Sequence, residues 1–111
     1  MGEFEQLVLL ATLRLGADAY GVEIRRAIQE RTGRDVAAGA VYTTLSRLEA
    51  RGLVSSRLGE SAPERTGQRR RYYQVEPAGA ATLQRTYQDV RSMAHGMLSE
   101  LSALAAKAEA E

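Results

Sequence analysis

The 111-residue sequence contains no cysteine, no tryptophan and one histidine. Without cysteine there can be no disulfide, no thiolate metal ligand and no cysteine nucleophile. His95 has no second histidine with which to complete a metal site, and no serine or threonine stands at motif spacing from a general base. The glycines are scattered between segments and form no phosphate-binding run. The sequence therefore predicts no catalytic residues, no metal site and no cofactor.

Long apolar segments are also missing. The longest apolar run, Leu7–Ala11, is far shorter than the roughly 20 residues that a membrane-spanning helix needs. The first residues lack the basic and apolar pattern of a secretory leader, and Gln6 breaks the pattern of a myristoylation signal. We therefore expect a cytoplasmic protein with no membrane partner.

Charge is plentiful, and arginine supplies nearly all of its positive part. The net charge is only +1, but 14 of the 15 basic residues are Arg. Residues 34–75 carry eight Arg against four acidic residues, whereas residues 76–111 carry three basic residues against five acidic ones. Arginine binds phosphates and guanine edges through two parallel hydrogen bonds, which lysine cannot do. This distribution favours a nucleic-acid partner, and a high genomic GC content is the competing explanation for the arginines.

The stretch Ala38–Gly52 has the pattern of an amphipathic helix with an unusual outer face. Val41, Leu45 and Leu48 recur at intervals of four and three residues and form one apolar stripe. The opposite face carries small and hydroxyl residues with a single arginine: Gly39, Thr43, Ser46, Arg47 and Ala50. So slim a face suits a recognition helix in the major groove of DNA. From this stretch alone, an ordinary amphipathic helix with few surface charges is an equal alternative.

Two helices are predicted before this stretch. Residues 3–15 are apolar on nearly every side and end at Gly16, so we expect this helix to contact both its own domain and a second chain. A second helix is expected over residues 20–32, with Asp18 as its N-cap. Its inward positions are Tyr20, Ile24, Ala27 and Ile28. Two helices joined by a short glycine-containing turn form a helix-turn-helix.

After Gly52 the apolar pattern changes from helical to alternating. Residues 53–58 and 70–75 are predicted to be strands, and residues 59–68 the polar loop between them. The positions expected to point inward are Val54, Ser56, Leu58, Tyr73 and Val75. Three helices followed by such an antiparallel hairpin predict a mainly α fold with a small two-stranded wing, the winged helix-turn-helix.

Arginines gather on the predicted wing. They lie at its tip and on its returning strand, and they are Arg65, Arg69, Arg70 and Arg71. Beside Tyr72, such a run is suited to holding phosphates next to the groove that the recognition helix occupies. A strand edge kept soluble by its charges is the other interpretation. The neighbouring low-charge helix favours the DNA contact.

A single long helix is predicted over residues 78–108, after Pro77. Its length of about 45 Å is too great for so small a domain to cover, and Gly96 within it costs about 1 kcal/mol relative to Ala. We expect it to pair with a second copy, so that residues 1–76 form a DNA-binding domain and residues 77–111 a dimerisation helix. Apolar residues spaced by four and three define the dimer interface: Leu83, Tyr87, Val90, Ala94, Met97, Leu101 and Leu104. Fraying of the alanine-rich end is the alternative for the last turns.

Three motifs together resemble the PadR family of transcriptional regulators. They are Tyr20–Ile24, Gly39–Leu53 and Gly67–Val75, followed by Gly79. Their order and spacing cover nearly the whole chain, and the single C-terminal helix resembles the short form of the family. The resemblance implies a homodimeric winged-helix repressor that binds a near-palindromic operator in double-stranded DNA. It also implies release by a small-molecule effector, which is common in the family.

The resemblance assigns roles to particular residues. The residues implied to contact DNA are Tyr42, Thr43, Ser46 and Arg47 on the groove-facing helix, and Arg69, Arg70 and Arg71 on the wing. Glu76 departs from the family pattern, in which Thr commonly caps the last helix. The lack of tryptophan argues against the aromatic drug stacking that some relatives use, but not against ligand binding in general.

One alternative function from another class stays open. A winged helix can bind a protein partner through the same low-charge helix and no longer bind DNA. The concentration of arginine around residues 34–75 favours DNA.

Overall fold

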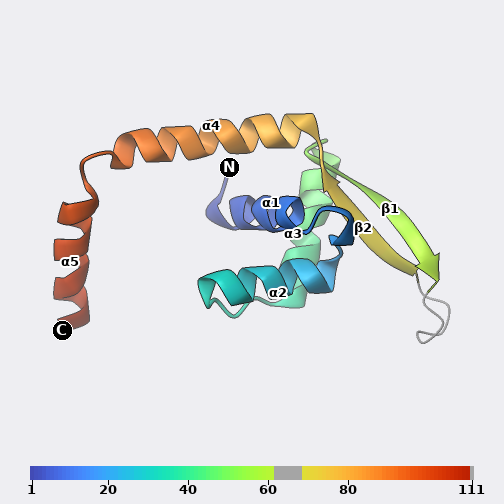
Figure 1. The fold of residues 1–111 in the computed structure, drawn as a ribbon, viewed down its shortest axis with the longest axis horizontal. Coiled ribbons are helices and arrows are strands. Elements are labelled where there is room, and N and C mark those ends of the chain that lie inside the picture. The colour runs from blue at the N-terminus through green and yellow to red at the C-terminus, as the bar shows by residue number, and fades with distance from the viewer. Residues whose placement is uncertain (62–68, 111) are drawn as a thin grey trace.

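The computed structural model describes residues 1–61 and 69–110 of the chain. Its elements, in chain order, are α1 (Glu3–Leu15), a 3₁₀ turn η1 (Gly16–Asp18), α2 (Gly21–Thr32), α3 (Ala38–Ala50), β1 (Val54–Ser61), β2 (Arg69–Val75), α4 (Pro77–Ala94) and α5 (Leu98–Ala110). Helices α1, α2 and α3 form a bundle from which the hairpin β1–β2 projects (Figure 1). From the base of the hairpin, α4 runs across the bundle, and α5 turns away at its far end. The predicted mainly helical fold with a small wing is confirmed.

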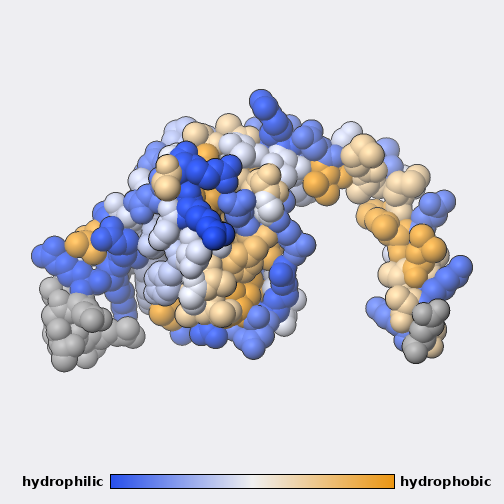
Figure 2. Space-filling view, turned by 180° about the vertical axis from the view of Figure 1, so that it is seen from behind, coloured by the Kyte–Doolittle hydropathy of each residue, from blue (hydrophilic) through white to orange (hydrophobic). Residues whose placement is uncertain are grey.

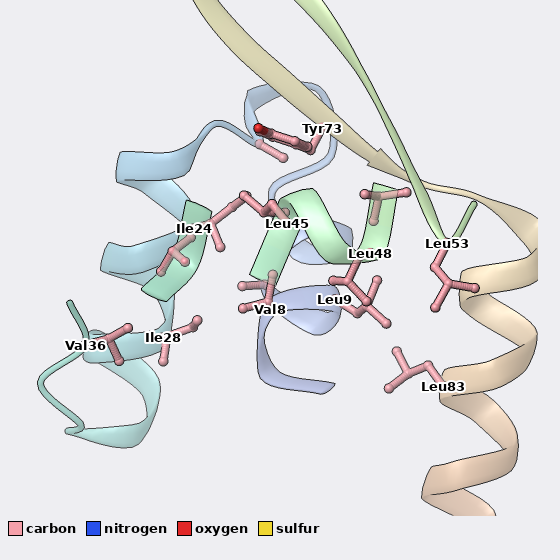
Figure 3. Close-up of a cluster of buried hydrophobic side chains, with 14 residues drawn as sticks. Val8, Leu9, Ile24, Ile28, Val36, Leu45, Leu48, Leu53, Tyr73 and Leu83 are labelled. Atoms are coloured by element: carbon pink, nitrogen blue, oxygen red, sulfur yellow. The ribbon is translucent and has the colours of Figure 1, made fainter. Parts of the chain in front are cut away.

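The apolar stripe of α3 lies in the middle of the bundle. Val41, Leu45 and Leu48 have no exposed surface, as their spacing predicts. They belong to a buried cluster to which α1, α2, both strands and α4 also contribute (Figure 3). Burying each such side chain contributes about 1.5–3 kcal/mol. This burial fixes the rotation of α3 and leaves its opposite face outside.

Helix α1 has the predicted bounds, and it ends at Gly16 with φ +56°. Val8 and Leu9 are fully buried, whereas Leu10 and Leu13 are 42% and 61% exposed. Within one chain, α1 therefore has one buried apolar face and one exposed apolar face.

The start of α2 differs from the prediction. Asp18 is not its N-cap but the last residue of η1, and α2 begins at Gly21 with Tyr20 in the cap position. An antiparallel bridge pairs Tyr20 with Tyr72 of β2 and holds Tyr20 in an extended conformation. The helix ends at Gly33 in the left-handed conformation, as its sequence indicates.

The hairpin pairs Val54 with Val75 and Arg57 with Tyr72. Tyr73 is buried and Val75 is half-buried, which confirms the inward side predicted for the second strand.

Two details of the wing were predicted wrongly. Strand β1 continues to Ser61, so residues 59–61 are strand and not loop. Leu58 was expected to point into the core, but it is 50% exposed. Its cross-strand partner Arg71 is exposed as well, because the hairpin projects from the bundle and its outer part lies away from the core (Figure 1). The predicted wing-tip residues Arg65, Pro63 and Gly67 lie outside the described residues.

Helix α4 is anchored to the bundle where it crosses the start of β1. A Cβ atom on Gly79 would lie 2.1 Å from the backbone oxygen of Leu53, so only glycine allows this approach. That same oxygen accepts a hydrogen bond from the Glu76 amide (2.9 Å). Pro77 opens the helix, and the Glu76 side chain makes no capping hydrogen bond, consistent with its poor fit as a cap.

The C-terminal region contains two helices where one was predicted. Helix α4 ends at Ala94 and α5 begins at Leu98, with Gly96 between them at φ +79°. A residue with positive φ cannot continue a right-handed helix, and glycine adopts that conformation at little cost. The prediction of one helix over residues 78–108 is therefore wrong. The spacing of four and three runs through residues 95–97 in the sequence, but the helix does not.

Helices α4 and α5 form an arm that exposes much apolar surface (Figure 2). Every described residue of α5 is exposed, and α5 lies apart from the three-helix bundle (Figure 1). Met93 at 81% and Leu98 at 68% are the most exposed of the large apolar side chains in the described residues. Exposed apolar surface of this extent is typical of interaction sites in general.

Replacing Gly96 with Ala should join α4 and α5 into one helix. Ala is strained by about 1–2 kcal/mol at positive φ and is about 1 kcal/mol better than Gly inside a helix. The NMR carbon shifts of residues 95–97 should therefore move to helical values. Gly39→Ala, which adds a Cβ in open space on α3, is the control and should leave those shifts unchanged. Non-helical shifts in Gly96→Ala would show that glycine does not cause the break.

Candidate nucleic-acid interface

The outer face of α3 is exposed along its length. The four residues predicted to contact DNA from this helix are all exposed: Tyr42, Thr43, Ser46 and Arg47. The charged residues of α3 are Arg47 and Glu49. Glu49 accepts a hydrogen bond from the Ser56 hydroxyl of β1 (2.6 Å), which draws its carboxylate toward the wing. The face is therefore slim, with hydroxyl groups and a guanidinium at its surface.

Tyr42 connects α3 to the start of α2. A Cβ atom on Gly21 would lie 2.4 Å from the Tyr42 ring, so the ring packs directly over the Gly21 backbone. Tyr42 is nevertheless 46% exposed. Its ring therefore lies where α2, α3 and solvent meet.

The three arginines of β2 alternate between exposed and half-buried along the strand. Arg69 and Arg71 are exposed, whereas Arg70 is half-buried. The guanidinium of Arg70 lies 4.5 Å from the centre of the Tyr20 ring. Successive strand residues point to opposite faces, so Arg70 points away from the face that Arg69 and Arg71 share.

Arg71 belongs to a polar chain that links the wing to α3. Its Nη1 donates to Ser56 Oγ (3.0 Å), and Ser56 donates to Glu49. Burial raises the pKa of the neighbouring Tyr73 phenol, and the positive charge of Arg71 opposes that rise. The base of the wing is thus joined to α3 by hydrogen bonds as well as by the core.

A concave basic surface lies between α2, α3 and β2. Its cavity has a volume of about 230 Å³ and is lined by Tyr20, Gly21, Val22, Tyr42, Arg69, Arg70 and Arg71. Three of these residues are arginines and none is acidic. The first residues of α2 also lie here, and a helix N-terminus carries a partial positive charge. The electrostatics of the cavity favour an anion.

Four other arginines form ion pairs or hydrogen bonds within the bundle. Arg26 pairs with Glu23, Arg34 with Glu3, and Arg51 with Glu5. Arg25 donates to the backbone oxygen of Val36 (2.5 Å). Such pairs neutralise charge on other parts of the bundle, and the wing arginines remain concentrated beside α3.

Sequence reasoning missed two residues of this surface, Tyr20 and Gly21. It treated Tyr20 as an inward residue of α2 and gave Gly21 no role. The signal was present in the first of the three motifs, which begins with this aromatic–glycine pair. Only the fold shows that the pair meets both Tyr42 and the wing.

The residues predicted to form a dimer interface fall in three places. Leu83 is buried in the chain's own core. Tyr87 lines an apolar groove of about 300 Å³ between α1 and α4, beside Leu10 and Leu13. The other five line a second groove, of about 580 Å³, between α4 and α5: Val90, Ala94, Met97, Leu101 and Leu104. Asp89 and Glu100 supply this second groove with acidic groups.

Within residues 1–61 and 69–110, no helix is both long and apolar enough to cross a membrane. In the same ranges, no three His, Cys, Asp or Glu side chains come together as a metal-binding group.

A family profile and a solved structure both point to the PadR family. The sequence profile of the transcriptional regulator PadR-like family matches residues 9–85. No curated protein sequence gives a significant match. Among solved structures, the chain is similar to a PadR family transcription regulator from Clostridium difficile R20291, with 28% identity and a TM-score of 0.70 over 90% of this chain and 99% of that one.

Two further solved structures share the fold at lower identity. A transcriptional regulator from Clostridium thermocellum is 24% identical, with a TM-score of 0.69 over 82% of this chain and 85% of that one. A PadR family transcriptional regulator from Eggerthella lenta is also 24% identical, with a TM-score of 0.68 over 89% and 86% of the two chains.

Proposed function

We propose that this chain, which belongs to the transcriptional regulator PadR-like family, binds an operator in double-stranded DNA as a homodimer and represses transcription from it. The observation that carries the proposal is the exposed, slim face of α3 beside a cavity lined by three arginines. Transcription is regulated where the chromosome lies, so we assign the protein to the cytoplasm.

In this proposal α3 enters the major groove. An α-helix with its side chains is about 10–12 Å wide, and the groove is about 12 Å wide, so small residues on the leading face are favourable. Thr43 and Ser46 offer hydroxyl groups to base edges. Arg47 can reach the O6 and N7 atoms of guanine with two hydrogen bonds.

The basic cavity is proposed to hold the phosphate backbone. Arg69 and Arg71 are exposed on one face of β2, and the Tyr42 ring and the first turn of α2 line the same cavity. Backbone amides at a helix N-terminus and arginine side chains are both common phosphate ligands in protein–DNA complexes. These contacts would set the position of α3 along the DNA.

The dimer is proposed to form through the arm, with residues 77–111 as the dimerisation region. The groove between α4 and α5 is assigned to α1 of a second copy. Helix α1 exposes Leu10 and Leu13 and continues to Arg14, which is also exposed. The groove offers apolar residues with Asp89 and Glu100, so its apolarity and charge are complementary to these three residues of α1. In a two-fold dimer the contact forms twice.

Release by a small molecule is proposed to act through the same region. The apolar groove between α1 and α4, about 300 Å³ in volume, is as large as a small ligand site. A ligand there would move α4 relative to the bundle, and the separation of the two α3 helices would change with it.

The operator can be identified by selecting bound duplexes from a random pool with the purified protein. A two-fold dimer should enrich an inverted repeat whose half-sites lie about one helical turn, or a multiple of it, apart. Affinity for that duplex should fall with salt, with a log–log slope of about −0.9 for each phosphate contacted. If no duplex is enriched and duplex affinity does not depend on salt, the chain is instead a protein-interaction module.

Replacing Arg47 with Ala should relax the preference at one base pair of the selected operator. The loss of a bidentate contact to guanine costs about 1–3 kcal/mol, and affinity for unrelated duplexes should change much less. Competition binding with single-base operator variants measures this. Arg85→Ala, which removes an exposed arginine from α4, is the control and should leave the preference unchanged. A preference that survives Arg47→Ala contradicts the assigned face of α3.

Reversing the acidic groups of the arm should dissociate the dimer. Asp89→Arg with Glu100→Arg places like charges opposite Arg14, and the dimer should weaken at least about tenfold. Adding Arg14→Asp to this variant should restore it. Sedimentation at micromolar concentration measures both effects, with the exposed Glu109→Arg as the control. A wild-type chain that sediments as a monomer, or a folded triple variant that stays monomeric, contradicts the contact.

A further inference from the structure

Four side chains at the base of the wing form a stack in which two adjacent tyrosine rings lie between two arginines. The guanidinium of Arg57 lies 4.8 Å from the centre of the Tyr72 ring. The Tyr72 and Tyr20 rings meet edge to face, with their centres 5.6 Å apart. The guanidinium of Arg70 then lies 4.5 Å from the centre of the Tyr20 ring. We call this stack of Arg57, Tyr72, Tyr20 and Arg70 the Arg–Tyr ladder.

The ladder spans elements that are also joined through the backbone. The Tyr73 amide donates a hydrogen bond to the Ala19 oxygen (2.8 Å), and Tyr20 and Tyr72 form an antiparallel bridge. Strand β2 is therefore paired on one side with β1 and at one point with the segment that leads into α2. The ladder lies where the wing meets the bundle.

The fit of Tyr72 requires a glycine in the facing strand. A Cβ atom on Gly59 would lie 2.4 Å from the Tyr72 ring, so the ring lies directly over the backbone of β1. Tyr20, at the other side of the ladder, precedes Gly21, over which the Tyr42 ring of α3 packs. A continuous series of contacts thus runs from β1 through Tyr72 and Tyr20 to α3.

The wing arginines fall into two groups that contact different surroundings. Arg70 and Arg57 lie over tyrosine rings, whereas Arg69 and Arg71 are exposed on the other face of β2. A guanidinium over an aromatic face is held there by electrostatic attraction and by packing of its stem. A change at Arg70 would therefore loosen the wing before it removed a phosphate contact.

We propose that the Arg–Tyr ladder fixes the angle between the wing and α3, and that Arg70 supports DNA binding as a positioning residue and not as a phosphate ligand. The second part rests on the proposed function, whereas the first concerns the protein without DNA. The two parts are therefore tested separately.

The first experiment measures the wing's position in the protein alone. The chain has no cysteine, so Leu58→Cys on β1 and Glu30→Cys on α2 give one pair of spin labels at exposed sites. The labelled protein is mixed with an excess of unlabelled chain, so that a dimer carries one pair. Tyr72→Ala should broaden the distance distribution, and Tyr72→Phe should leave it narrow, because the ring contacts need no hydroxyl.

Arg70→Ala in the same labelled protein should also broaden the distance distribution. If Tyr72→Ala does not fold, Arg70→Ala alone provides the test. A distribution that stays as narrow as the wild type in every folded alanine variant overturns the ladder. This result would not depend on whether the protein binds DNA.

The second experiment compares Arg70→Ala with Arg69→Ala on the selected operator over a range of salt concentrations. Loss of a phosphate ligand should reduce the magnitude of the log–log slope by about 0.9, and we expect this for Arg69→Ala. For Arg70→Ala we expect affinity to fall about tenfold with the slope unchanged, since a positioning residue releases no counterion. Tyr72→Ala should behave like Arg70→Ala, and Tyr72→Phe like the wild type.

Two outcomes overturn the assignment of Arg70. One is a slope that changes as much in Arg70→Ala as in Arg69→Ala, which would make Arg70 a phosphate ligand. The other is an operator affinity that Arg70→Ala leaves unchanged. If the wild-type protein binds no duplex, the proposed function fails. The distance measurements alone then decide whether the Arg–Tyr ladder fixes the angle of the wing.

Discussion

The burial of one narrow stripe of α3 is the contact on which the rest of the structure depends. Val41, Leu45 and Leu48 are fully enclosed by the other elements of the bundle. A helix held by three large apolar residues on one side cannot rotate without exposing them, at a cost of several kcal/mol. The opposite face of α3 is then exposed to solvent, and no further contact is needed to keep it there. A small domain can thus present a low-charge helix that would not be stable alone.

The surface around α3 is organised by pairing and by stacking of its arginines. Arginines on other parts of the bundle form ion pairs such as that between Arg51 and Glu5. Along β2, Arg69 and Arg71 are exposed and Arg70 lies over the Tyr20 ring, as the strand period requires. The positive charge near α3 therefore depends on where the fold places these arginines, and net charge alone does not reveal it. This explains how a chain of net charge +1 can carry a basic cavity.

The C-terminal arm has a different relation to the core. Its first turns are held by the close approach at Gly79 and by the burial of Leu83, and from there on its apolar residues are largely exposed. Gly96 divides it, so the exposed apolar residues line a bend and not a straight seam. A bend provides acidic and apolar groups from two helices around one groove. This geometry is the reason why the proposed dimer places α1 of a second copy in the groove.

The sequence by itself determined the order of the helices and strands as far as the start of α4, the core stripe of α3 and the inward residues of β2. Each follows from a local period of apolar residues or from a glycine at a helix end, and such signals do not depend on distant contacts. The resemblance to the PadR family, and not the apolar pattern, suggested that Tyr42 and the wing arginines act together. What it could not determine was set by contacts between distant segments or by the conformation of one residue. The bridge from Tyr72 moved the start of α2 away from Asp18, and a positive φ at Gly96 outweighed an unbroken apolar spacing. Only the tertiary structure decided which arginine stacks and which faces solvent, because that depends on the ring that the fold places beside each one.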